Sequence, residues 1–134
     1  MSQRIAVVTG AAGGMGRAIV NALIGDGAKC YGIDISGDGL KEMGSILGNK
    51  FVGIAIDLTE SDEILSAFKQ IKATEGGVDI LVNNAGTCLM SNFPDVPVAE
   101  FELQMNLNFN SAFHCSQAAM KLMKGRPGVR KIIN

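Results

Sequence analysis

The sequence contains few of the residues from which metal sites and nucleophilic catalytic sites are built. It has one histidine, His114, and three cysteines, Cys30, Cys88 and Cys115, with no C-x-x-C spacing. An odd number of cysteines without that spacing predicts neither a disulfide framework nor a zinc site, so we expect three buried or half-buried small apolar side chains. One histidine leaves almost nothing from which to build a metal centre or a Ser-His-Asp triad, and we expect His114 on a helix surface.

A strong charge of either sign and long apolar runs are also absent. The chain has 12 lysine and arginine residues against 13 aspartate and glutamate residues, a net charge of -1, which gives no electrostatic reason to bind nucleic acid or an anionic membrane. The four apolar residues after Met1–Arg4 are too few for a secretory signal, and no apolar run approaches the length of a membrane span. We therefore expect a cytoplasmic protein without nucleic-acid or membrane partners, and 134 residues suffice for one domain.

Short apolar runs alternate along the chain with stretches whose apolar residues recur at helical spacing. This alternation predicts an α/β domain with right-handed crossovers and a parallel sheet covered on both faces. Residues 36–39 are expected to form a turn and residues 87–97 a loop. The expected strands are residues 5–8, 29–34, 51–56, 78–82 and 130–134, and the expected helices are 17–24, 40–47, from a start within 59–62 to 73, and 98–123.

The first expected strand runs into the glycine-rich turn T-G-A-A-G-G-M-G. Glycines allow the chain to reverse tightly and let a diphosphate approach backbone N–H groups that a Cβ would shield. The helix behind the turn points its free N–H groups and its positive dipole end at the phosphates. We expect this turn to bind a dinucleotide, with the Thr9 hydroxyl holding it in shape; the residues concerned are Thr9, Gly10, Gly14, Met15 and Gly16.

An aspartate ends the second expected strand. Asp34 stands where an acid can accept hydrogen bonds from both hydroxyls of an adenosine ribose and repel a 2′-phosphate. We therefore expect Asp34 and the following Ile35 in the cofactor site, and NAD in preference to NADP. Arg17 is an observation in favour of NADP, because its side chain is long enough to contact a phosphate.

The glycine pattern differs from the strict G-x-G-x-x-G fingerprint, because Ile19 stands where a third glycine would follow Gly14 and Gly16. Together with Gly10, these glycines instead form T-G-x-x-x-G-x-G, and here the sequence resembles the short-chain dehydrogenase/reductase family in its plain, non-extended form. The resemblance implies a Rossmann-like, doubly wound parallel sheet with strand order 3-2-1-4-5. It also favours NAD, because many NADP-using relatives carry a basic residue where this chain has Gly13.

Two further motifs carry the resemblance. Asp57 and Leu58 follow the third expected strand, where the family contacts adenine, the acid accepting from the exocyclic amine and the leucine packing nearby. An aspartate before a helix is also a good cap, and that alternative stays open for Asp57. The N-N-A-G stretch after the fourth strand resembles the family's cofactor cleft, in which Asn84 steadies the sheet while Ala85 and Gly86 leave room for the ribose.

The long expected helix contains N-L-N-F-N-S-A-F, which resembles the family's N-x-x-x-x-F pattern and assigns the catalytic asparagine to Asn108. Its implied role is to bend the helix and hold a water that extends a proton relay to the active-site lysine. Asn106 and Asn110 lie two positions away, so the choice among the three stays open. For the aromatic and methionine residues of this helix we expect core packing, with the homodimer or homotetramer interface of the family as the alternative.

The family transfers a hydride between a nicotinamide and an alcohol or carbonyl substrate, using a serine and a Y-x-x-x-K pair. This chain has no Y-x-x-x-K, since its one tyrosine, Tyr31, lies in the second expected strand. We expect residues 1–134 to be a single, incomplete NAD(P)-binding Rossmann domain that stops before the sixth and seventh strands and is inactive alone. The fifth strand would lie on an uncovered edge of the sheet, which also indicates that the domain is incomplete. The alternative is a non-catalytic truncated member that binds a nucleotide or a partner protein.

Overall fold

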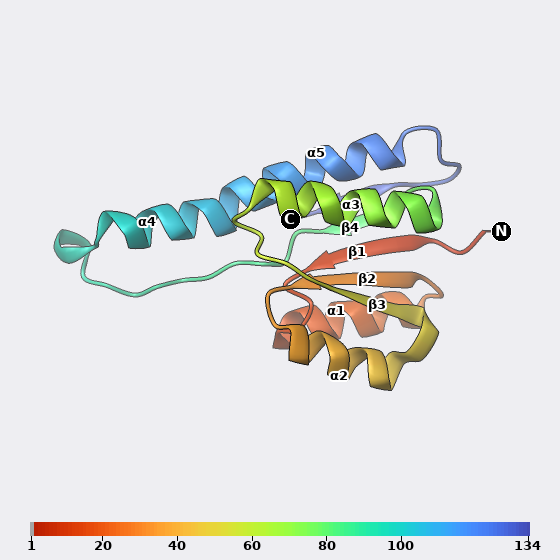
Figure 1. The fold of residues 1–134 in the computed structure, drawn as a ribbon, viewed down its shortest axis with the longest axis horizontal. Coiled ribbons are helices and arrows are strands. Elements are labelled where there is room, and N and C mark those ends of the chain that lie inside the picture. The colour runs from red at the N-terminus through yellow and green to blue at the C-terminus, as the bar shows by residue number, and fades with distance from the viewer. Residues whose placement is uncertain (1) are drawn as a thin grey trace.

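A five-stranded parallel sheet forms the centre of the computed structural model, which describes residues 2–134 (Figure 1). Every neighbouring pair of strands is parallel, and the order is β3-β2-β1-β4-β5. This confirms the Rossmann-like order implied by the family resemblance. The strands are β1 (Ile5–Thr9), β2 (Lys29–Asp34), β3 (Phe51–Ala55), β4 (Ile80–Val82) and β5 (Lys131–Ile133).

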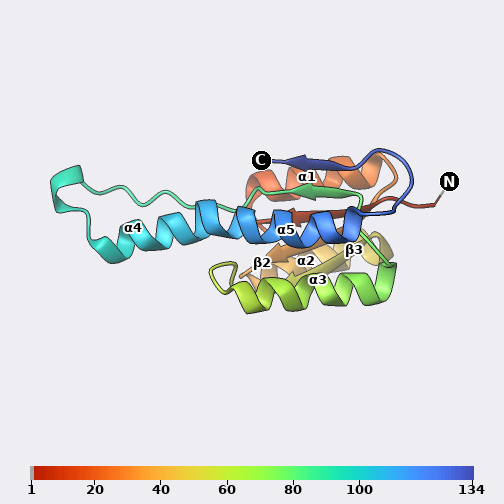
Figure 2. The ribbon, with the colours of Figure 1, turned by 90° about the horizontal axis from the view of Figure 1, so that it is seen from above.

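Helices cover both faces of the sheet. α1 (Gly14–Gly25) and α2 (Gly37–Leu47) lie on one face, and α3 (Ser61–Glu75) and α5 (Ser111–Met123) lie on the other (Figure 1). Figure 2 shows α3 and α5 running side by side, and the two helices contact each other. The sheet is therefore doubly wound, as the alternation of apolar runs and helical patterns predicts.

The central strands β1 and β4 are almost continuously apolar because they are buried on both faces of the sheet. In β1, Ile5 and Val7 belong to the core beneath α3 and α5, whereas Ala6 and Val8 belong to the core beneath α1 and α2. Successive side chains of a strand point to opposite faces, so one short strand supplies both cores.

Helix α2 begins earlier than the sequence predicts. Residues 36–39 were expected to form a turn, but α2 begins at Gly37 and the Ser36 hydroxyl accepts a hydrogen bond from the Gly39 N–H, at 3.2 Å. This prediction is wrong because the serine cap and the packing of Leu40 and Met43 in the core outweigh the low helix propensity of two glycines.

The long helix forms as predicted, but it is interrupted. α4 (Val98–Met105) passes into a π-helical turn at Asn106–Asn110 and then into α5, and the Ser111 N–H bonds to the Asn106 carbonyl five residues earlier. Figures 1 and 2 both show α4 and the loop before it extending beyond the end of the sheet. We call residues 87–109 the arm.

The predicted core packing of the aromatic residues on this helix is wrong. Phe101, Phe109 and Phe113 are 56%, 66% and 57% exposed, and Met105 is 41% exposed, whereas Ala119 and Met123 are buried. Three of these exposed side chains lie on the arm, which has no strand beneath it, whereas Phe113 lies on an exposed side of α5, and only the side of α5 that faces the sheet contributes to the core. The prediction for the cysteines also fails in part, since Cys30 and Cys115 are buried but Cys88, on the arm, is exposed. Within residues 2–134, no helix combines the length and the apolarity needed to cross a membrane.

A charged network joins the elements at the amino ends of the strands. Asp79, just before β4, is buried and accepts hydrogen bonds from Arg126 Nε at 2.6 Å, Arg126 Nη2 at 2.7 Å and the Ile5 N–H at 2.8 Å. Burial opposes ionisation of Asp79, but the bonds from Arg126 and Ile5 outweigh it and hold the pKa of the carboxyl below its ordinary value. The loop after α5 is thereby fixed to the starts of β1 and β4.

Glu75, at the end of α3, also lies at the amino ends of the strands. Its Oε1 accepts from Lys29 Nζ at 2.5 Å and from the Tyr31 hydroxyl at 2.7 Å. The bond from Lys29 holds the pKa of Glu75 below its ordinary value, while burial and the bond to Glu75 raise the pKa of Tyr31 to about 12. The single tyrosine of the chain is thus a structural group.

Replacing Arg126 is expected to destabilise the protein strongly. Arg126→Ala leaves the Asp79 carboxylate buried without its cation, and breaking a buried pair in this way costs about 3 kcal/mol of the free energy of unfolding. Urea unfolding at pH 7 measures the change. Lys124→Ala, an exposed lysine two positions away, is the control, and an equal effect of both substitutions would contradict the role of the pair.

The effect of Arg126→Ala is expected to shrink in acid. The lowered pKa values of Asp79 and Glu75 mean that their contribution is fully present above the unfolded-state carboxyl pKa of about 4 and is lost as the pH falls through the lower folded-state values. Unfolding free energies of the wild type and Arg126→Ala should therefore converge between about pH 5 and pH 2. A difference that is independent of pH would rule out the ionised pair as its cause.

Candidate functional site

The turn between β1 and α1 has an open, positively polarised end. Gly13, the N-cap residue, has no side chain to accept from the first N–H groups of α1, and no described side chain caps them. Gly14 begins the helix, and a Cβ there would meet none of the described atoms within 4 Å. Met15, beside it, is 72% exposed. Free N–H groups at a helix N-terminus with open space before them form a ready site for an anion.

Two other glycines of the turn are required by the chain's own packing. Gly10 has φ +64°, and a Cβ there would approach the Ala85 Cα to 2.9 Å. A Cβ on Gly16 would lie 2.0 Å from the Gly10 carbonyl oxygen. The turn therefore closes against the segment that follows β4, and only glycine fits at these two positions.

Thr9 and Asn84 lock the carboxyl ends of β1 and β4 together. The buried Thr9 hydroxyl accepts from the backbone N–H groups of Asn84 and Ala85, both at 3.0 Å. The Asn84 side-chain amide donates to the carbonyls of Thr9 at 3.1 Å and Gly10 at 3.2 Å. These two side chains face the backbone rather than the pocket, so the structure places them behind the site.

Asp34 lies at the carboxyl end of β2, next to the glycine turn. Its Oδ2 accepts from the Ala12 N–H at 3.0 Å, and its Oδ1 accepts from the Ser36 N–H at 2.9 Å. Each carboxylate oxygen retains a further lone pair for a ligand donor. Ile35 follows with 73% of its surface exposed. The carboxylate is thus held in one orientation while still able to accept hydrogen bonds.

Asp57 and Leu58 approach the same region from the end of β3. One oxygen of Asp57, Oδ1, accepts from the N–H and hydroxyl of Thr59 at 2.9 and 2.7 Å, and the Asp57 N–H donates to Glu63 at 2.7 Å. The capping alternative is therefore wrong in detail, because Asp57 stabilises the turn before α3 whereas Glu60 occupies the N-cap position. Leu58 is buried in the core.

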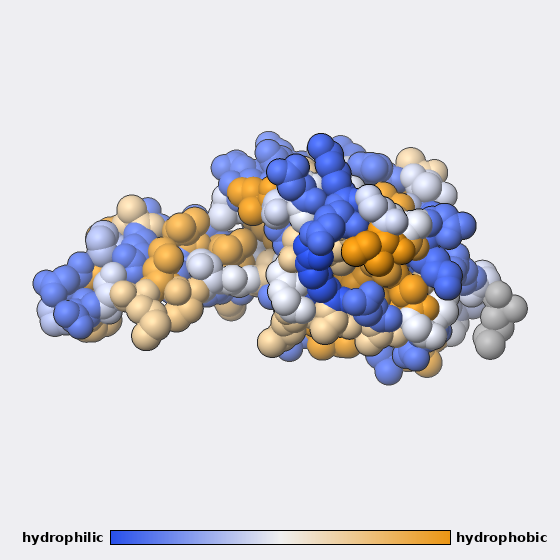
Figure 3. Space-filling model, turned by 90° about the horizontal axis from the view of Figure 1, so that it is seen from below, coloured by the Kyte–Doolittle hydropathy of each residue, from blue (hydrophilic) through white to orange (hydrophobic). Residues whose placement is uncertain are grey.

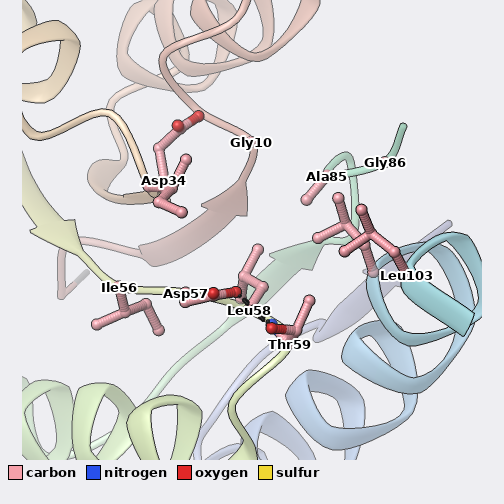
Figure 4. A pocket seen from close by; sticks show the side chains of 11 residues that line it. Gly10, Asp34, Ile56, Asp57, Leu58, Thr59, Ala85, Gly86 and Leu103 are labelled. Carbon is pink, nitrogen blue, oxygen red and sulfur yellow. Dashed lines mark hydrogen bonds between the residues drawn. The ribbon is translucent and has the colours of Figure 1, made fainter. Parts of the chain in front are cut away.

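These strand ends surround a pocket of about 280 Å³ (Figure 4). It lies at the carboxyl edge of the sheet, where ligands bind in open parallel α/β sheets. Thr9, Gly14, Met15, Gly16, Asn84 and Asn108 are not among its lining residues. The lining residues are Gly10, Asp34, Ile35, Ile56, Asp57, Leu58, Thr59, Ala85, Gly86, Leu103 and Leu107.

The sequence did not identify four of the lining residues. Ile56 and Thr59 flank Asp57 and Leu58, so their place follows once that motif is assigned. Leu103 and Leu107 come from the arm, and their i, i+4 spacing would put them on one helix face. That this face turns toward the glycine turn depends on the direction of the long helix, which no local pattern specifies.

Asn108 joins the two ends of the arm, because it binds the first residue of the arm, Thr87. Its Oδ1 accepts from the Thr87 N–H and its Nδ2 donates to the Thr87 carbonyl, both at 2.7 Å. Gly86 packs tightly beside it, since a Cβ there would lie 3.2 Å from Asn108 Oδ1. Asn106 and Asn110 bond to each other instead, at 2.7 Å. Of the three asparagines left open by the sequence, Asn108 is the one whose side chain hydrogen-bonds to the segment that follows β4.

Among residues 2–134, no group of three or more histidine, cysteine, aspartate or glutamate side chains lies close enough together to hold a metal ion. His114 lies on α5, half-buried, with its ring edge-on to Phe113.

Comparisons with known proteins identify relatives of this chain. The family model described as short chain dehydrogenase matches residues 4–134. The 3-oxoacyl-[acyl-carrier-protein] reductase FabG of Salmonella typhimurium is 38% identical over 126 residues, which are 93% of this chain and 52% of that protein. The FabG protein of Haemophilus influenzae is 36% identical over 135 residues, covering 100% of this chain and 55% of that protein.

A solved structure shares the fold. The structure of a short-chain dehydrogenase from Streptomyces avermitilis superimposes with a TM-score of 0.90 and 27% identity, covering 98% of this chain and 48% of that chain. The present chain spans about half the length of these relatives. The match of the family model to nearly every residue shows that the chain belongs to the short-chain dehydrogenase/reductase family.

Proposed function

We propose that the protein is an NAD(P)-dependent oxidoreductase that transfers a hydride between a nicotinamide cofactor and a small alcohol or carbonyl substrate. Residues 1–134 form its cofactor-binding half. One observation carries the proposal: the N–H of Ala12, two residues before the uncapped N-terminus of α1, donates to the Asp34 carboxylate, so free helix N–H groups lie close to a carboxylate that lines the pocket. Membership of the short-chain dehydrogenase/reductase family supports it.

In this proposal each wall of the site receives one part of the dinucleotide. The N–H groups of Gly14, Met15 and Gly16 bind the diphosphate. Asp34 accepts from the adenosine ribose, with Ile35 alongside. The adenine lies toward the end of β3, where Leu58 supplies an apolar wall. The second carboxylate oxygen of Asp57, Oδ2, accepts no hydrogen bond from residues 2–134 and is available to the adenine amine. Ala85 and Gly86 line the way toward the second ribose.

NAD is proposed over NADP. A 2′-phosphate would have to approach the Asp34 carboxylate, whose orientation is fixed by two backbone N–H groups. Gly13 contributes no cation on the other side of the ribose site. Repulsion between two anions at contact distance in a partly buried site disfavours the phosphorylated cofactor.

For the reaction itself we propose a positioning role for Asn108. The cofactor supplies the hydride chemistry when bound. Asn108 accepts from the Thr87 N–H, donates to the Thr87 carbonyl and packs on Gly86, so it sets the distance between the long helix and the segment that follows β4. The π-helical turn around it leaves backbone carbonyls out of the regular α-helical pattern, where a water of a proton relay can bind.

The chain contains no Y-x-x-x-K, so we propose that residues 1–134 by themselves bind cofactor without turning over a substrate. The second candidate is a non-catalytic family member that binds a nucleotide or a partner protein, and the exposed apolar side chains of the arm favour it. Turnover of any alcohol by residues 1–134 alone would refute the proposal that this part of the protein is inactive by itself.

We also propose that the protein is a homodimer or homotetramer that associates through α4 and α5. Phe101, Met105, Phe109 and Phe113 recur every four residues and are all exposed, forming an apolar stripe along the helix. Figure 3 shows apolar surface along the arm. A contiguous exposed apolar stripe is a feature of protein–protein interfaces.

Gly14→Ala is expected to weaken NAD binding about tenfold or more without lowering stability. The added methyl group enters open space in the free protein, so folding is unaffected, but it keeps a diphosphate away from the helix N–H groups. Isothermal titration calorimetry and urea unfolding provide the two measurements. Gly25→Ala, at the other end of α1 and also open, is the matched control. Wild-type affinity in Gly14→Ala would exclude this turn as the diphosphate site.

Asp34→Ala is expected to weaken NAD binding and to strengthen NADP binding, because it removes both the ribose acceptor and the charge that repels a 2′-phosphate. The ratio of the two dissociation constants is the quantity to measure. Asp26→Ala, exposed at the far end of α1, should leave the ratio unchanged. An unaltered ratio in Asp34→Ala would refute the role of this aspartate.

Phe113→Lys is expected to convert the oligomer to smaller species, because it places a charge in the apolar stripe. Sedimentation velocity at micromolar concentration measures the distribution. Leu65→Lys, an exposed leucine on α3, introduces the same charge elsewhere and should not alter it. A wild-type protein that sediments as a monomer would contradict the interface.

A further inference from the structure

Arg17 of α1 lies between the glycine turn and α2. Its Nε donates to the Ala12 carbonyl at 2.9 Å, and its Nη2 pairs with Glu42 Oε2 of α2 at 2.8 Å. Gly39 makes room for this arrangement, since a Cβ there would lie 2.9 Å from the Ala12 Cβ and 3.5 Å from Arg17 Nη2. The guanidinium is therefore held by a neutral acceptor, the Ala12 carbonyl, and by a charged acceptor, the Glu42 carboxylate.

Ala12 links this guanidinium to the proposed ribose site. Its carbonyl accepts from Arg17, while its N–H donates to Asp34. A phosphate added to the ribose 2′-oxygen would lie beside Asp34, which is joined to the Arg17 guanidinium through the single residue Ala12. Charges act on one another over about 8 Å at physiological salt. Arg17 is positioned to attract such a phosphate unless its charge is already neutralised.

We propose that Glu42 is a specificity-determining residue that suppresses NADP binding by pairing with Arg17. This inference rests on the proposed dinucleotide site. Glu42 accepts the hydrogen bond of Arg17 Nη2 and offsets the guanidinium charge. The repulsion between Asp34 and a 2′-phosphate is then not balanced by an attraction to Arg17. Loss of Glu42 leaves Arg17 anchored by the Ala12 carbonyl beside the site, with a free Nη2 and an uncompensated charge.

The exposure of the pair sets the size of the effect. The side chains of Arg17 and Glu42 are 33% and 61% exposed, so solvent screens their attraction. Exposed ion pairs of this kind have coupling energies that correspond to changes in affinity of about two- to fivefold. The Arg17–Glu42 pair therefore changes the preference for NAD over NADP only modestly, and the larger part of that preference comes from Asp34.

The test is a double-mutant cycle on cofactor binding. Dissociation constants of NAD+ and NADP+ are measured by calorimetry for the wild type, Glu42→Gln, Arg17→Ala and the double variant. Glu42→Gln is expected to bind NADP+ about three- to fivefold more tightly, with NAD+ affinity unchanged. In the Arg17→Ala background the same substitution should have no effect on NADP+ affinity. Asp26→Asn, at the opposite end of α1, controls for the loss of one negative charge.

The outcomes separate this inference from the proposed function. NADP+ affinity that rises equally with and without Arg17 would overturn the inference, because a general charge effect then suffices. Unchanged NADP+ affinity in Glu42→Gln, with NAD+ still bound, would overturn it while leaving the dinucleotide site intact. A wild-type protein that binds neither cofactor would overturn both.

Discussion

The hydrogen bonds between Thr9 and Asn84 are the constraint on which the rest of the site depends. They pin the carboxyl ends of β1 and β4 at a fixed separation, with the glycine turn on one side and the N-N-A-G segment on the other. Gly10 adopts a left-handed conformation against Ala85, so the two loops approach more closely than side chains would permit. The glycine turn before α1 packs against this contact, and Asp34 is joined to that turn through the Ala12 N–H.

The two edges of the sheet serve different purposes. At the amino ends of the strands, Asp79, Arg126, Glu75 and Lys29 satisfy one another in buried or half-buried ion pairs. At the carboxyl ends, the helix N–H groups and one side of the Asp34 carboxylate remain available. Parallel strands impose this polarity, because every βα turn falls at the same edge and brings helix N-termini and loop residues together there. The buried ion pairs therefore lie at the amino ends of the strands, and the pocket lies at the carboxyl ends.

The arm connects the pocket to the outside of the molecule. Leu103 and Leu107 face the pocket from one side of the long helix, while Phe109 and Phe113 lie exposed on the stripe. Asn108 ties this helix to Thr87 at the π-helical turn, so a displacement of the stripe would be transmitted to the wall of the cleft. Association through the stripe would therefore act on the side of the pocket formed by the long helix, whereas Arg17 and Glu42 belong to α1 and α2, which cover the other face of the sheet.

The sequence by itself determined the α/β class, the approximate limits of the strands, the glycine turn and Asp34, because these depend on local periodicity, on glycine's backbone freedom and on a fixed spacing between consecutive elements. The start of α2 was missed, since a serine cap and core packing outweighed glycine propensity. Only the tertiary structure decided that Phe101, Phe109 and Phe113 are exposed, that Leu103 and Leu107 reach the pocket, and that Arg17 pairs with Glu42. Apolar periodicity reports which helix face is apolar, but not whether a sheet lies beneath it, and contacts between residues far apart in the chain are set by the packing of whole elements.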